Sequence, residues 1–184
     1  MDGLLYRLHI SELNLLDKYQ EAIQMFVKDL QFVQTEYNEQ KENPPLARNL
    51  PPISGKITWS RQLYRRITGP IEVMKRHPNV MEMAETKKAI KGYNRLARVL
   101  VEYEIVFMNV WTTQMDKAEA GLSATILIRD PENSRLLINF DSNIYELQKE
   151  IEVVEKLGME LPPKAKLLKT KGEDLKLKYQ SVNV

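Results

Sequence analysis

Residues 11–41 contain neither proline nor glycine, and their apolar side chains repeat with a heptad period. An a/d seam sustained over about three heptads predicts a long amphipathic helix of the kind found in coiled coils and long bundles. Ser11 can cap the start of this helix, and Asn43-Pro44-Pro45 marks its end. Such a helix must bury its apolar stripe against other helices or a partner. The predicted seam consists of Leu16, Tyr19, Ile23, Phe26, Leu30, Val33 and Tyr37.

The following segment, residues 42–52, holds four of the nine prolines and predicts an extended linker or a sharp corner. A helix is expected after it, with Ser54 available as its cap. Gly55-Lys56 resembles the end of a phosphate-binding loop, but that loop needs glycine where Leu50 stands and Ser or Thr where Ile57 stands. Nucleotide binding there is rejected. The candidate structural corner or interface comprises Pro51, Pro52, Ile53, Gly55, Ile57, Trp59 and Leu63.

The rest of the chain predicts more helices and one hairpin. A helix is expected at about 58–75, bent or restarted at Gly69-Pro70, and a long one at about 80–120. Two short β-branched runs around a turn predict a β-hairpin at about 124–140. Helices then follow from about residue 142 to Gly158 and from Pro162-Pro163 onward. The expected fold is mainly α: an elongated bundle of long amphipathic helices with one inserted hairpin.

The domain organisation follows from the same pattern. Residues 1–42 form a long heptad-patterned helix, and residues 43–184 form a helical-bundle segment. An apolar repeat that still runs at the last residues predicts a fragment of a much longer chain. Trp111 is expected in the core, whereas Trp59 is left open between core and interface anchor.

Composition removes several function classes. Lys and Arg number 27 against 25 Asp and Glu, and this balance gives nucleic-acid binding no support. There is no cysteine for disulfides or thiolate metal sites, and no stretch approaches the ~20 apolar residues of a membrane span. His9 and His77 stand far apart, and no catalytic motif is visible. We therefore expect no enzymatic activity in this segment, no cofactor, no metal and no membrane association.

Two basic clusters leave alternatives open. Arg61, Arg65 and Arg66 lie within two helical turns, and lysines crowd the segment from 164 to 178. Each cluster is either a solvated helix face, the interpretation we favour, or a contact for an acidic partner.

The order of these elements resembles the N-terminal tail, or stem, of axonemal dynein heavy chains. The resemblance covers roughly residues 43–184. It is carried by the segment 51–63, the Arg65-Arg66-Ile67-Thr68-Gly69-Pro70-Ile71 step, Glu102-Tyr103-Glu104 with Trp111, the exit Leu136–Asp141 and the segment 146–162. The most specific parts are the proline-glycine-tryptophan corner and Asn139-Phe140-Asp141.

The resemblance implies a non-catalytic structural and assembly role. Dynein tails lie before the linker and the ATPase ring, transmit force, associate with other heavy chains and carry intermediate and light chains. Implied partners are those subunits and, through the assembled complex, the microtubule doublet of a cilium or flagellum. The implied location is the cytoplasm, the cytoskeleton and the axoneme. One alternative is a stand-alone helical adaptor that binds a partner helix through the seam at residues 11–41. Another is electrostatic binding to microtubules or nucleic acid through the lysine-rich C-terminal helix.

Overall fold

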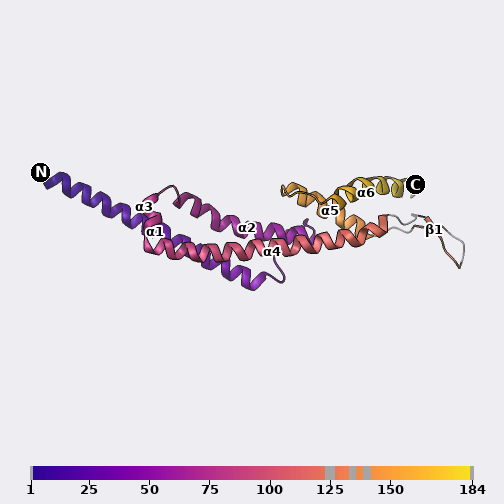
Figure 1. The fold of residues 1–184 in the computed structure, drawn as a ribbon, viewed down its shortest axis with the longest axis horizontal. Coiled ribbons are helices and arrows are strands. Elements are labelled where there is room, and N and C mark those ends of the chain that lie inside the picture. Colours follow the sequence, from indigo (N-terminus) through magenta and orange to yellow (C-terminus); the bar gives the residue numbers. More distant parts are fainter. Residues whose placement is uncertain (1, 123–126, 133–135, 139–141, 183–184) are drawn as a thin grey trace. The chain divides into compact units, whose positions relative to one another are not determined.

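The computed structural model describes residues 2–122, 127–132, 136–138 and 142–182. These residues form six helices and one pair of short antiparallel strands, so the mainly α class is confirmed (Figure 1). In the hairpin, Leu127 pairs with Ile138 and Arg129 with Leu136. Residues 124–126, 133–135 and 139–140 of the expected hairpin lie outside the described residues. The elements are α1 (Asp2–Gln40), α2 (Pro52–Met74), α3 (Pro78–Glu82), α4 (Ala84–Leu122), β1 (Leu127–Arg129), β2 (Leu136–Ile138), α5 (Ser142–Lys156) and α6 (Pro163–Val182).

Two predicted helix starts are wrong. Helix α1 begins at Asp2, so Ser11 lies inside this helix and does not cap its start. Helix α2 begins at Pro52, a turn and a half before Thr58, because a proline is compatible with the first turn of a helix, where its missing N–H has no partner to lose. Of the bend or restart expected at Gly69-Pro70, the restart does not occur: α2 continues through Pro70, since the proline removes only one intrahelical hydrogen bond near the helix end. The bend stays a prediction. The end of α1 before Asn43-Pro44-Pro45 agrees with the prediction.

Gly158 ends α5 as the sequence predicted. Its φ of 72° lies in the left-handed region that favours glycine. The Gly158 N–H donates to the Glu155 carbonyl at 2.9 Å, and the Met159 N–H donates to the Val154 carbonyl at 3.3 Å. This pair of bonds is the Schellman arrangement, which satisfies carbonyls that the last helical turn would leave unpaired.

The chain packs into two compact units. Unit 1 comprises residues 1–45 and 59–103, and unit 2 comprises residues 46–58 and 104–184, so the division falls within α2 and within α4. The organisation expected from the sequence, a long helix at residues 1–42 and a helical-bundle segment at residues 43–184, stays a prediction.

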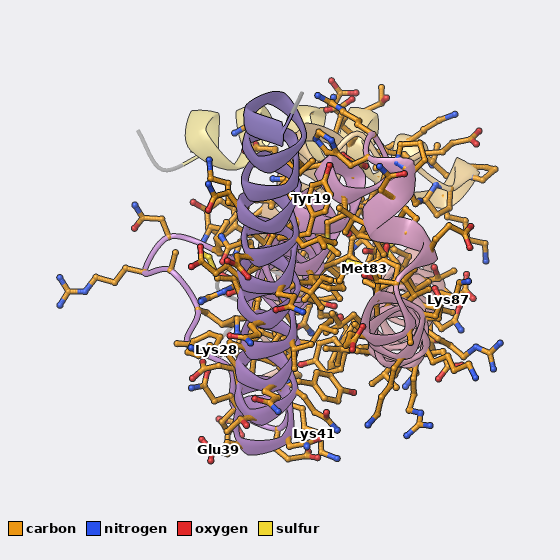
Figure 2. The ribbon with its side chains drawn as sticks, turned by 90° about the vertical axis from the view of Figure 1, so that its left-hand side faces the viewer. Tyr19, Lys28, Glu39, Lys41, Met83 and Lys87 are labelled. Atoms are coloured by element: carbon orange, nitrogen blue, oxygen red, sulfur yellow. The ribbon has the colours of Figure 1, made fainter. Side chains whose placement is uncertain are left out.

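Unit 1 buries the apolar stripes of α1, α2 and α4. Phe26 and Val33 of α1, Ile67 and Ile71 of α2 and Leu100 of α4 are each at most 2% exposed. The Tyr19 ring of α1 lies 6.2 Å from the His77 ring, and the Phe26 ring lies 6.3 Å from the Tyr93 ring. Figure 2 shows Tyr19 and Lys28 on α1, and Met83 and Lys87 where α3 gives way to α4.

Unit 2 has its own core. Trp111 of α4 is fully buried, as the sequence predicted, together with side chains of α2, α5 and α6. Its other buried members are Ile53, Ile57, Met115, Ile144, Leu147, Ile151, Val154, Leu161, Ala165 and Leu168.

Candidate assembly site

The proline corner is the start of α2, and its backbone donors are fully accounted for. A helix leaves the N–H groups of its first four residues without intrahelical acceptors. Here Pro51 and Pro52 have no N–H to satisfy. The N–H groups of Ile53 and Ser54 donate to the two carboxylate oxygens of Glu150, at 2.8 and 2.7 Å. The Gly55 N–H then makes the first helical bond, to the Pro51 carbonyl at 2.8 Å.

Glu150 acts as a helix cap contributed from a distant part of the chain. It lies on α5, almost a hundred positions along the chain from the backbone groups it binds, and is only 3% exposed. A buried carboxylate is costly unless it is hydrogen-bonded, and two N–H donors at the positive end of a helix provide that compensation. The cap thereby fixes the start of α2 against α5.

Ser54 is not the cap that the sequence suggested. It is the third residue of α2, and its backbone N–H is a donor to Glu150. Its hydroxyl oxygen is buried and has no hydrogen-bond partner among the described residues. The Ser54 carbonyl accepts a bond from the Thr58 hydroxyl at 2.7 Å.

Close packing explains the glycine and isoleucines of the corner. A Cβ added at Gly55 would lie 3.1 Å from Leu46 Cδ1 and 3.4 Å from Leu50 Cβ. Because glycine has no Cβ, the segment that contains Leu46 and Leu50 can lie close against α2. Ile53 and Ile57, at 7% and 0% exposure, enter the core of unit 2. The Lys56 ammonium lies 4.6 Å from the centroid of the Phe107 ring.

Trp59 and Leu63 belong to unit 1, where both are buried. The Trp59 ring stacks on Tyr37 at 6.2 Å and meets Tyr103 edge-on at 5.6 Å. The Tyr103 hydroxyl donates to the Lys41 carbonyl at 2.8 Å, and burial, followed by the charges of Tyr37 and Glu42, raises the Tyr103 pKa to about 12. Trp59 of α2 is therefore a core residue of unit 1, where it packs against side chains of α1 and α4.

The predicted seam of α1 is buried only in its middle. Ile23, Phe26, Leu30 and Val33 are at most 9% exposed, whereas Leu16 is 48% exposed. Tyr19 and Tyr37 are half-buried and make the ring contacts described above. Packing within unit 1 thus occupies the centre of the seam, which counts against its use as a docking stripe for an adaptor.

The basic clusters are partly neutralised. The Arg66 guanidinium donates to Asp29 at 3.1 Å and lies 3.9 Å from the centroid of the Phe32 ring. In α6, Lys164 pairs with Asp116 of α4, and Lys169 pairs with Glu155 of α5. Exposed pairs of this kind contribute little stability, but they favour the solvated-face interpretation.

Metal binding has no candidate site in the part of the chain that the structure describes. There, no group of three or more His, Asp or Glu side chains is placed to hold a metal ion. The described helices likewise include none with the length and apolar character needed to cross a membrane.

Fold and corner together define a helical segment held by packing and by a buried helix cap. A profile of the family described as dynein heavy chain, N-terminal region 1, matches residues 3–184. The chain belongs to the dynein heavy chain family, and the match lies in the N-terminal region, which is not the catalytic motor domain.

Individual relatives agree with this assignment. The chain is 38% identical to dynein axonemal heavy chain 5 of Mus musculus over 178 residues, or 97% of this chain. It is 40% identical over 149 residues (81% of the chain) to dynein axonemal heavy chain 8 of Mus musculus. It is 32% identical over 169 residues (92% of the chain) to the dynein gamma chain, flagellar outer arm, of Chlamydomonas reinhardtii. The chain spans only 3–4% of the length of these relatives.

Proposed function

We propose that this chain is a structural and assembly segment of an axonemal dynein heavy chain tail, located in the axoneme of a cilium or flagellum. In that role it transmits force and mediates association with other heavy chains or with intermediate and light chains. The family match over residues 3–184 carries the proposal, and the axonemal and flagellar names of the relatives support the location.

The packing suits a segment that bears load. Helix α2 has its first turn bound to Glu150 in unit 2 and its Trp59 packed against α1 and α4 residues in unit 1. Displacing the first turn of α2 would break buried hydrogen bonds, and displacing Trp59 would break ring contacts. Close-packed interiors resist such deformation. The stand-alone adaptor is less well supported, because the middle of its docking seam is already buried.

The proposal is tested with an antibody raised against recombinant residues 1–184. Isolated axonemes and cell bodies are compared by immunoblot, and proteins released from axonemes are immunoprecipitated and identified by mass spectrometry. We expect a band of dynein heavy chain size enriched in axonemes, with other heavy, intermediate or light chains in the precipitate. A band confined to cell bodies, or a precipitate without dynein subunits, would refute the axonemal assembly role.

A further inference from the structure

The part of α4 that belongs to unit 1 carries a concentration of positive charge on its solvent side. From residue 86 to residue 101 the sequence contains five basic residues and no acidic one. All five are exposed. They are Lys87, Lys88, Lys91, Arg95 and Arg98.

Four of these residues form a straight row along the helix. Lys88, Lys91, Arg95 and Arg98 follow one another at intervals of three, four and three positions. That spacing keeps side chains on one face of an α-helix. At a rise of ~1.5 Å per residue the row is about 15 Å long. We call these four residues the basic row.

The basic row lies on the side of α4 that the core leaves free. The apolar residues Ala89, Leu96 and Leu100 occupy the other side of the helix and are at most 7% exposed. The core of unit 1 therefore uses the apolar face of α4, and the charged face stays available to a partner.

The rest of the protein does not neutralise the basic row. Its four members make no ion pair with any other residue that the structure describes. Lys87, beside the row, pairs with Glu82 at 2.8 Å. The nearest carboxylates along α4 are Glu85 before the row and Glu102 after it. Towards α1, the residues around Lys88 are mostly glutamines and apolar residues.

This lack of internal partners distinguishes the basic row from the other basic clusters. Arg66, Lys164 and Lys169 each pair with a carboxylate of another helix. Like charges three or four residues apart repel each other and destabilise a helix. An acidic partner would relieve this repulsion in the basic row.

The spacing of the row identifies a helix as the partner. A second α-helix packed along α4 has the same rise per residue, so carboxylates at three- and four-residue intervals would each face one cation. Nucleic acid fits less well, because Tyr93, the one aromatic residue between 86 and 101, is half-buried beside Phe26 and offers no stacking surface. A membrane would require an exposed apolar face, and that face of α4 is buried.

We propose that the basic row of α4 binds an acidic helix of a separate polypeptide. Aspartates or glutamates at three- and four-residue intervals on that helix pair with Lys88, Lys91, Arg95 and Arg98. The proposal rests on the assembly role proposed above and specifies the chemistry of one partner.

Two synthetic peptides of about three heptads probe the row. Both have the same composition of Glu, Ala and Gln, which are good helix formers. In the facing peptide one glutamate for each cation of the row lies on a single helix face. In the scattered peptide the same glutamates are distributed around the helix.

Fluorescence anisotropy measures binding of both peptides to the full 184-residue chain and to the variant Lys91→Glu/Arg95→Glu. The control variant, Arg65→Glu/Arg76→Glu, makes the same change of charge at exposed positions of α2. Circular dichroism confirms that each variant is folded. A carbodiimide, which joins a carboxylate to a lysine amine, maps the contact by mass spectrometry.

We expect the facing peptide to bind at least about fivefold more tightly than the scattered one, because exposed ion pairs are weak singly but add up along a row. Lys91→Glu/Arg95→Glu should weaken the facing peptide by at least about tenfold, and the control by less than about threefold. Cross-links should form at Lys88 and Lys91.

Equal affinity of the two peptides, or equal loss in the two variants, would show general electrostatic attraction and overturn the proposal. Cross-links confined to lysines outside the row would also overturn it, as would tighter binding of duplex DNA or of anionic lipid vesicles. A dimer of the chain that Lys91→Glu/Arg95→Glu dissociates would instead make a second copy the occupant. Failure of the facing peptide with axonemal location intact would refute the binding row alone. Peptide binding in a protein absent from axonemes would refute the proposed function alone.

Discussion

Replacing Glu150 with Ala should destabilise unit 2, because it removes both acceptors at the start of α2. Each buried N–H left without a partner costs about 1–3 kcal/mol. Part of that cost is returned, because Ala no longer keeps a carboxylate out of water. We therefore expect a net loss of about 2–4 kcal/mol in the free energy of unfolding. Glu150→Gln retains one acceptor oxygen and should lose about 1–2 kcal/mol.

The assay is urea denaturation followed by tryptophan fluorescence. The chain has two tryptophans, so in a Trp59→Phe background the signal comes from Trp111, which lies in the core of unit 2. Glu152→Ala, an exposed glutamate on the same helix, is the matched control and should change stability by less than about 0.5 kcal/mol. Amide NMR provides a second reading, since the Ile53 and Ser54 N–H resonances should shift upfield when their charged acceptor is lost.

Two results would refute this reasoning. One is an Ala variant as stable as the Glu152→Ala control. The other is a destabilised variant in which the Ile53 and Ser54 amide resonances do not move, because the loss would then come from packing and not from the cap.

Three further predictions concern packing and ionisation. Gly55→Ala should destabilise unit 2 by about 1–2 kcal/mol, because the added Cβ would press on Leu46. Gly92→Ala, where the added Cβ has room, should stabilise the chain by about 0.5–1 kcal/mol. Thermal unfolding compares the two variants, and equal effects would contradict the close approach of Leu46 to Gly55. Trp59→Ala and Ile57→Ala should each lower the free energy of unfolding by about 2–5 kcal/mol in urea denaturation. The control, Leu16→Ala at an exposed position, should lower it by less than about 0.5 kcal/mol. A loss under ~1 kcal/mol for Trp59→Ala and Ile57→Ala would instead indicate a binding role for these residues. The folded Tyr103 pKa of about 12 lies above the unfolded value of 10.0, so its contribution to stability is complete below pH 10.0 and is lost as the pH rises toward 12. Tyr103→Phe should flatten that alkaline decline, and an identical pH profile would exclude the contribution.

Much of the fold could be predicted because helix signals are local. The heptad stripe of α1, the proline boundary after it and the glycine at the end of α5 all act within a few residues of the feature they determine. The start of α2 differs from the prediction because it is not set by local signals. A double proline permits an extended entry or a first helical turn, and contacts from α5 decide between them.

The environment of Trp59 could not be predicted from its own segment. Its sequence context leaves core and interface equally open, because the rings that pack on it, Tyr37 and Tyr103, belong to other helices.

The Glu150 cap did leave a signal in the sequence, in two halves that are far apart. On α5, an acidic residue stands three positions after Leu147 and four before Val154, within a stripe whose other members are buried. On α2, the helix starts at Pro52, and Pro51 stands at its cap position in place of Ser, Thr, Asp or Asn. A buried carboxylate needs donors, and a buried helix start without a capping residue needs an acceptor. Each half is an unsatisfied requirement by itself, and pairing them predicts the contact between Glu150 and the first turn of α2.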